Sequence, residues 1–159
     1  QLDSDFQLLF PDDYINNVTE RLNLYTALNQ IKDEENLLKF EAELVDRFGE
    51  LPTEAEDLLN SVRIKWIATN IGIEKVVMKK GKLIGYFIAD QQSEFYQSPQ
   101  FTKVLQFVQS HAHLCKIKEK ETRNGLRLLL VFENIKSVDN ALKAISPLAL
   151  SPKSETLST

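Results

Sequence analysis

The spacing of hydrophobic residues changes at Gly72, and this change constrains the fold more than any other feature of the chain. Before Gly72, apolar residues recur every three or four positions, which is the spacing of one face of an α-helix. After it, β-branched and aromatic residues form short runs bounded by polar turns, which is typical of β-hairpins. The pattern predicts an α+β fold, in which an N-terminal helical half is followed by antiparallel β-hairpins with two further helices.

Three helices are predicted in the first half. The first extends over about residues 13–31, with Asp12 and Asp13 as favourable residues at its start. The second ends at Gly49, because glycine adopts the left-handed backbone that closes many helices. The third begins at Thr53 and stops at Gly72. Their apolar faces are predicted to consist of Ile15, Val18, Leu22, Tyr25 and Leu28, of Leu37, Phe40, Leu44 and Phe48, and of Leu58, Leu59, Val62, Trp66 and Ile67.

Two hairpins and two helices are predicted in the second half. One hairpin lies within residues 73–88 and the other within 114–132, each around a polar turn that contains glycine. Ser98 and Ser137 are predicted to cap the two helices. We expect a single domain over residues 1–150, with a helical part at 12–72 and a hairpin and helix part at 73–150, followed by a disordered tail at 151–159.

The chain has a single cysteine and no apolar run of the ~20 residues that span a bilayer. A chain with no possible internal disulfide is expected in a reducing compartment, so a cytoplasmic location without membrane contact is predicted. The chain opens without a signal peptide and without methionine. It is therefore expected to be a segment of a longer polypeptide.

Opposite charges dominate the two parts of the chain. Residues 1–60 contain 15 acidic and 4 basic side chains, whereas residues 61–159 contain 8 acidic and 15 basic ones. Such an asymmetry concerns partners rather than fold. Two oppositely charged solvated surfaces and a functional charge patch are both compatible with it.

Catalytic motifs are missing from the sequence. It has no phosphate-binding loop, no dinucleotide fingerprint, no nucleophile elbow and no zinc-protease motif, so no catalytic residue and no cofactor is predicted. His111, His113 and Cys115 alternate, and they are the one cluster of nitrogen and sulfur ligands. Because structural zinc usually takes four protein ligands, no metal site is predicted there.

Lysines at the predicted hairpins suggest a nucleic-acid interface as an alternative function. Lys79, Lys80 and Lys82 crowd the first turn, and Lys116, Lys118 and Lys120 alternate along a later strand. Phosphate contacts require such a density of cations. Lysines on exposed strands also prevent edge-to-edge aggregation, and this ordinary explanation is preferred because the net charge is −4.

The segment from Glu43 to Pro52 is the most informative stretch of sequence. Leu44 and Phe48 are predicted to point inward, and Glu43, Asp46 and Arg47 to line the flank of the same helix. A Glu43–Arg47 surface pair would stabilise the helix by only about 0.2–0.5 kcal/mol. Physical reasoning alone does not decide between such a pair and a docking surface.

The chain resembles the C-terminal domain of the bacterial transcription-repair coupling factor family, Mfd. The run Glu-Leu-x-Asp-Arg-Phe-Gly-x-Leu-Pro at residues 43–52 is the most specific match, and residues 8–75 match closely. Val45 stands where many relatives carry isoleucine, and beyond Ile88 only the order of elements agrees. The other matching positions are Leu9-Phe10-Pro11, Tyr14-Ile15, Arg21-Leu22, Leu24-Tyr25, Leu58-Leu59, Ile64-Lys65, Ala68 and Gly72-Ile73.

The resemblance implies a regulatory domain within a modular parent. That parent would be an ATP-dependent translocase on double-stranded DNA that displaces stalled RNA polymerase and recruits UvrA for nucleotide excision repair. The domain itself would be non-catalytic. It would dock on a UvrB-like N-terminal module, mask the surface that UvrA must reach and so cause autoinhibition. The family's docking residues correspond to Glu43, Asp46 and Arg47.

Overall fold

The computed structural model describes residues 1–149, and the chain divides into two compact units. One unit is Gln7–Arg63, and the other combines Gln1–Phe6 with the chain from Ile64 onward. Their boundary lies within helix α3 (Thr53–Asn70) rather than at Gly72. A single domain over 1–150 stays a prediction, and the tail predicted at 151–159 lies outside the described residues.

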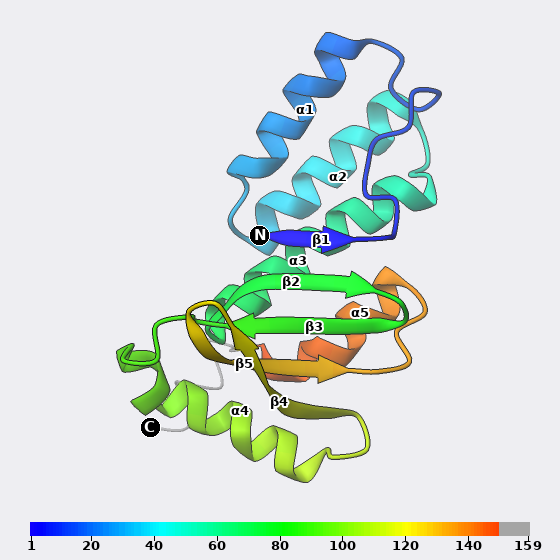
Figure 1. Cartoon of the computed structure of the whole chain (residues 1–159). Coiled ribbons are helices and arrows are strands. Elements are labelled where there is room, and N and C mark those ends of the chain that lie inside the picture. Colours follow the sequence, from blue (N-terminus) through cyan, green and yellow to red (C-terminus); the bar gives the residue numbers. More distant parts are fainter. Residues whose placement is uncertain (150–159) are drawn as a thin grey trace. The chain divides into compact units, whose positions relative to one another are not determined.

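The unit Gln7–Arg63 is helical, as predicted, and contains α1 (Val18–Gln30), α2 (Glu34–Phe48) and the first part of α3 (Figure 1). In α2, Asp33 is the N-cap and Gly49, with φ of 91°, is the C-cap. The residues of the unit that are buried include Phe10, Ile15, Leu28, Leu37, Phe40, Leu44, Ala55, Leu59 and Val62.

The predicted start of the first helix is wrong, and so is part of its predicted apolar face. Helix α1 begins at Val18, and the side chain of Asn17 caps it by accepting a hydrogen bond from the amide of Glu20. The preceding residues form a separate turn, because the carbonyl of Pro11 accepts the amides of Tyr14 and Ile15. Val18 and Leu22, which were predicted on the apolar face, are 58% and 60% exposed, whereas Leu28 is buried.

The other unit is built on a five-stranded mixed sheet with the order β1-β2-β3-β5-β4. Both predicted hairpins are confirmed, and they join because β3 pairs with β5. A further strand, β1, pairs in parallel with β2, an addition that the sequence did not predict. The strands are β1 (Leu2–Ser4), β2 (Ile73–Lys79), β3 (Lys82–Phe87), β4 (Cys115–Thr122) and β5 (Gly125–Phe132).

Two further α-helices follow the first three, as predicted. Ser98 caps α4 (Pro99–Ser110) and Ser137 caps α5 (Val138–Ile145) through their side-chain oxygens. Short 3₁₀ helices, η1 (Glu94–Gln97) and η2 (Ser146–Leu148), flank them. No helix within the described residues is long and apolar enough to cross a membrane.

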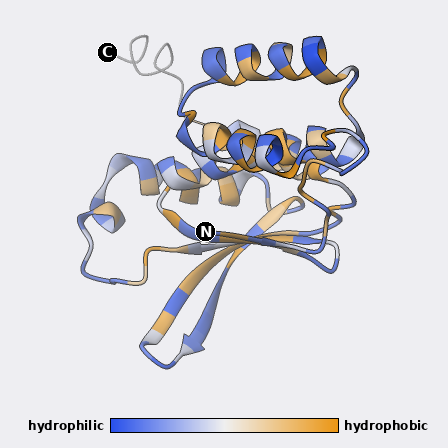
Figure 2. Ribbon diagram, turned by 90° about the horizontal axis from the view of Figure 1, so that it is seen from above, coloured by the Kyte–Doolittle hydropathy of each residue, from blue (hydrophilic) through white to orange (hydrophobic). Residues whose placement is uncertain are grey.

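The two faces of the sheet differ sharply. Residues opposite one another on paired strands point to the same face, so the strand register assigns each side chain. One face is buried and carries Val76, Met78, Leu83, Phe87, Leu130 and Phe132. The other, which we call the basic sheet face, carries Lys75, Lys79, Lys82, Lys116, Lys118, Lys120 and Arg127. In Figure 2, β4 is largely hydrophilic beside the more hydrophobic β5.

Candidate docking surface

Helix α2 separates an apolar face from a charged one. Leu37 and Leu44 are 0% and 1% exposed, and Phe40 is also buried. Glu43, Asp46 and Arg47 are exposed, as their positions between the inward residues require. The helix therefore presents all three residues of the predicted docking set to the surroundings without using them in the core.

Arg47 has a partner that the sequence did not indicate. Its guanidinium forms an ion pair with the carboxylate of Glu20 in α1 and lies 4.8 Å from the ring centre of Phe48. The Glu43–Arg47 pair within α2, one of the two alternatives left open by the sequence, is not formed. Arg47 therefore connects two helices of its unit in addition to facing outward.

Glu43 and Asp46 lack such partners. Neither carboxylate forms an ion pair with any side chain in residues 1–149. An exposed carboxylate keeps its hydration and its full charge until a cation approaches it. These two side chains are thus the free acidic groups of the docking set.

An exposed apolar stripe beside Asp46 was missed by the sequence analysis. Leu38 and Val45 are 51% and 45% exposed and lie seven positions apart, with Ala42 between them. Together with Glu41 and Asp46 they line a shallow hollow on α2. The positions of Leu38, Ala42 and Val45, at i, i+4 and i+7, could have revealed this stripe in the sequence. Residues with that spacing share one side of a helix, and here it is not the side that faces the core.

The two ends of α2 are fixed by contacts from within the unit. The hydroxyl of Tyr14 donates to the carbonyls of Gly49 at 2.8 Å and Leu44 at 3.3 Å, and its partial burial raises the pKa of Tyr14. At the other end, Arg63 donates to both carboxylate oxygens of Glu34 at 2.8 and 2.7 Å, and Glu34 raises the pKa of Arg63. The charged face is therefore presented on an anchored helix.

The three lysines predicted at the first hairpin turn are not equivalent. Lys79 forms an ion pair with Asp3 at 3.0 Å, and Lys82 forms one with Glu133 at 3.7 Å. Lys80 has φ of 54° in the turn, and its backbone amide donates to Asp5. Two of the three ammonium groups are thus already bound to carboxylates.

His111, His113 and Cys115 do not meet at a common point. The ring of His111 stacks on Phe107 with 4.0 Å between ring centres, and its Nδ1 lies 2.9 Å from the carbonyl oxygen of Phe107. Cys115 is buried, and burial raises the pKa of its thiol. Within the described residues, no three His, Cys, Asp or Glu side chains are placed to hold a metal ion.

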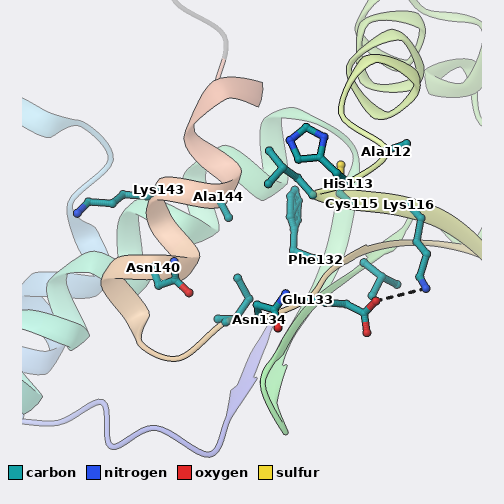
Figure 3. A pocket seen from close by; sticks show the side chains of 13 residues that line it. Ala112, His113, Cys115, Lys116, Phe132, Glu133, Asn134, Asn140, Lys143 and Ala144 are labelled. Atoms are coloured by element: carbon teal, nitrogen blue, oxygen red, sulfur yellow. Dashed lines mark ion pairs between the residues drawn. The ribbon is translucent and has the colours of Figure 1, made fainter.

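His113 and Cys115 instead line a pocket of about 500 Å³ at the beginning of β4 (Figure 3). Among the lining residues, Lys116 forms an ion pair with Glu133 at 3.4 Å (Figure 3). The lysine neighbours lower the pKa of Glu133. Two of the charged groups in this wall, Lys116 and Glu133, are therefore paired with each other.

Comparison with known proteins supports the resemblance found in the sequence. A family model described as the TRCF domain matches residues 4–98. The transcription-repair-coupling factors of Rickettsia bellii and Escherichia coli are 32% identical over 112 residues and 41% identical over 68 residues, covering 70% and 43% of this chain. These matches span only 9% and 6% of the relatives' own lengths.

The fold is also similar to a solved structure. A crystal structure of the C-terminal domain of transcription-repair coupling factor superposes with a TM-score of 0.67 at 22% identity. The alignment covers 94% of this chain and 92% of that one. At this level of identity the similarity concerns the fold alone, and it includes the part of the chain beyond residue 98 that the family model does not match.

Proposed function

Because this chain belongs to the transcription-repair-coupling factor family through its TRCF domain, we propose that it is a regulatory domain that docks on the UvrB-like N-terminal module of its own polypeptide. In the docked form it masks the surface that UvrA must reach, so the parent is autoinhibited. Release of the domain exposes that surface. The domain contributes binding surface only, and the chemistry belongs to other parts of the parent.

The observation that carries this proposal is the pair of free carboxylates on α2. Glu43 and Asp46 are exposed on an anchored helix and form no ion pair within the described residues. The expected counterparts on the N-terminal module are basic side chains, which match the acidic character of residues 1–60. Complementary charge of this kind sets the orientation and the rate of association.

The other activities of the parent are proposed only because this chain belongs to the family. They include ATP-driven translocation on double-stranded DNA, displacement of stalled RNA polymerase and recruitment of UvrA. The matched segment spans about a tenth of the curated relatives, and these activities are therefore proposed for the parent rather than for this chain.

Titration of this chain with the purified N-terminal module of its parent, followed by calorimetry, tests the docking. We expect the double variant Glu43→Lys and Asp46→Lys to bind at least about tenfold more weakly, a loss of ~1.4 kcal/mol. The control is Asp13→Lys with Glu56→Lys, which makes the same change in net charge at exposed positions outside α2. Equal weakening by both pairs would mean that net charge rather than the α2 site controls binding.

A further inference from the structure

The two lysine-rich hairpins combine on a single surface, the basic sheet face. In the register, Lys75 is opposite Tyr86, and Tyr86 is opposite Leu129. Leu129 in turn is opposite Lys118. Lysines that are more than forty positions apart in the sequence thus point to the same side of one sheet. The surface is a property of the folded sheet and does not depend on the docking proposal.

Carboxylates neutralise only part of this face. Asp3 binds Lys79, Glu74 binds Arg127 at 2.9 Å, and Glu133 is shared between Lys82 and Lys116. The seven cations of the face thus outnumber the three carboxylates that pair with them by four. The ammonium groups of Lys75, Lys118 and Lys120 form no ion pair within residues 1–149.

Cations also crowd around one aromatic ring at the centre of the face. Lys75, Lys120 and Arg127 lie 5.6, 5.6 and 5.4 Å from the ring centre of Tyr86. Like charges gathered around one ring repel each other, and the ring's negative face together with Glu74, which binds Arg127, offsets only part of that repulsion. A polyanion that binds across the face would relieve the repulsion and release its own counterions.

From this arrangement we propose that the basic sheet face binds the phosphate backbone of double-stranded DNA, independently of base sequence. Lysines at every second position of β4 are spaced by about 7 Å, given a rise of ~3.4 Å per residue, which suits a row of backbone phosphates. Arg127 is held by Glu74 and by the carbonyl of Phe87, so it does not reach toward bases. Contacts from lysine alone position a duplex without reading it.

Two other classes of partner fit the face less well. Single strands are usually held by aromatic rings on which bases stack, but the ring of Tyr86 is surrounded by cations. Acidic proteins bind through apolar anchors ringed by polar groups. The apolar residues of this face provide little such anchor, because Leu129 and Val131 are only 7% and 2% exposed and Val77 and Ile84 are half-buried between the lysines.

The test is fluorescence anisotropy of a short labelled duplex titrated with the whole chain between about 50 and 200 mM salt. The chain has a net charge of −4, so its overall field repels DNA, and binding must come from a local patch. The test variant is Lys75→Ala, Lys118→Ala and Lys120→Ala. The control is Lys32→Ala, Lys103→Ala and Lys136→Ala, which removes the same charge from exposed positions off the face.

We expect micromolar to submillimolar duplex binding, weakened at least about tenfold in the test variant and less than about twofold in the control. The magnitude of the negative slope of log K against log[salt] should be smaller by about 2–3 in the test variant. Absence of duplex binding at low salt, or equal losses in the two variants, overturns the proposal. Tighter binding of a single strand or of polyglutamate overturns the assignment to duplex DNA. Circular dichroism of both variants serves as the control for folding.

Discussion

The guanidinium of Arg47 in α2 forms an ion pair with the carboxylate of Glu20 in α1, so one member of the proposed docking set is also a contact between helices. Glu43 and Asp46 have no comparable role inside the unit. The docking set therefore consists of two free acids and one arginine whose position is fixed from α1. A variant with all three charges reversed would lose the contact of Arg47 with α1 as well as any docking contacts, so a loss of binding could not be assigned to docking. The test variants therefore keep Arg47.

A double-mutant cycle should detect this ion pair. Arg47 and Glu20 are 46% and 36% exposed at their side chains, and pairs of this kind stabilise proteins by about 0.2–1 kcal/mol. We expect a coupling in that range between Glu20→Ala and Arg47→Ala, measured by urea unfolding. The same cycle between Glu43→Ala and Arg47→Ala should give a coupling near zero, and a larger coupling there would show that the alternative pair within α2 forms after all.

Two leucines of α2 provide a matched test of its orientation. Leu44 is 1% exposed and Leu38 is 51% exposed. Leu44→Ala should reduce the free energy of unfolding by about 2–5 kcal/mol, because it empties a packed site. Leu38→Ala should change it by less than about 0.5 kcal/mol. Similar losses in the two variants would contradict the assignment of the buried face.

The cap of α2 should make stability depend on pH in the acid range. The hydrogen bonds that Asp33 accepts from the amide and the side chain of Asn36, at 2.8 and 2.9 Å, lower the pKa of Asp33 below 3.8. A lowered pKa stabilises the folded state above the pKa of the unfolded chain, and that contribution disappears as pH falls through the lower folded value. The variant Asp33→Asn keeps a capping oxygen and does not titrate. The free energy of unfolding of this variant should therefore fall less steeply below about pH 4 than that of the unaltered chain, as measured by denaturation at each pH.

The single cysteine should be protected by folding. Cys115 is 4% exposed, and burial raises the pKa of its thiol. The thiolate is the reactive form, so both effects slow alkylation. A thiol reagent at neutral pH should label the folded chain far more slowly than the chain in urea. Equal rates would show that the beginning of β4 opens readily.

Much of this fold follows from local sequence signals. Ser98 and Ser137 cap their helices, and the polar turns at Lys80 and Asn124 close their hairpins, because capping and turn chemistry act over a few residues. The start of α1 was misplaced for a physical reason. Pro11 organises its own turn, and periodicity alone does not separate a turn from the helix that follows it.

Contacts between residues that are far apart in the chain could not be predicted from local sequence patterns. The parallel pairing of β1 with β2 joins Leu2 to Val76, and no local pattern in three residues encodes such a partner. The Glu20–Arg47 pair and the convergence of Lys75 with Lys118 depend in the same way on tertiary packing and strand register. The exposure of Glu43 and Asp46, by contrast, followed from the spacing of the buried residues of one helix.

Titration of UvrA against the full-length parent is the decisive test of autoinhibition through α2. Three proteins are compared: the unaltered parent, the Glu43→Lys and Asp46→Lys variant, and a variant with Lys79, Lys80 and Lys82 changed to alanine. If docking masks the UvrA surface, the α2 variant should raise the apparent UvrA affinity by about 5–150-fold, the usual range of such couplings. The hairpin variant should leave the affinity unchanged. Unchanged affinity in a folded α2 variant, or a change in the hairpin variant alone, would contradict autoinhibition through α2.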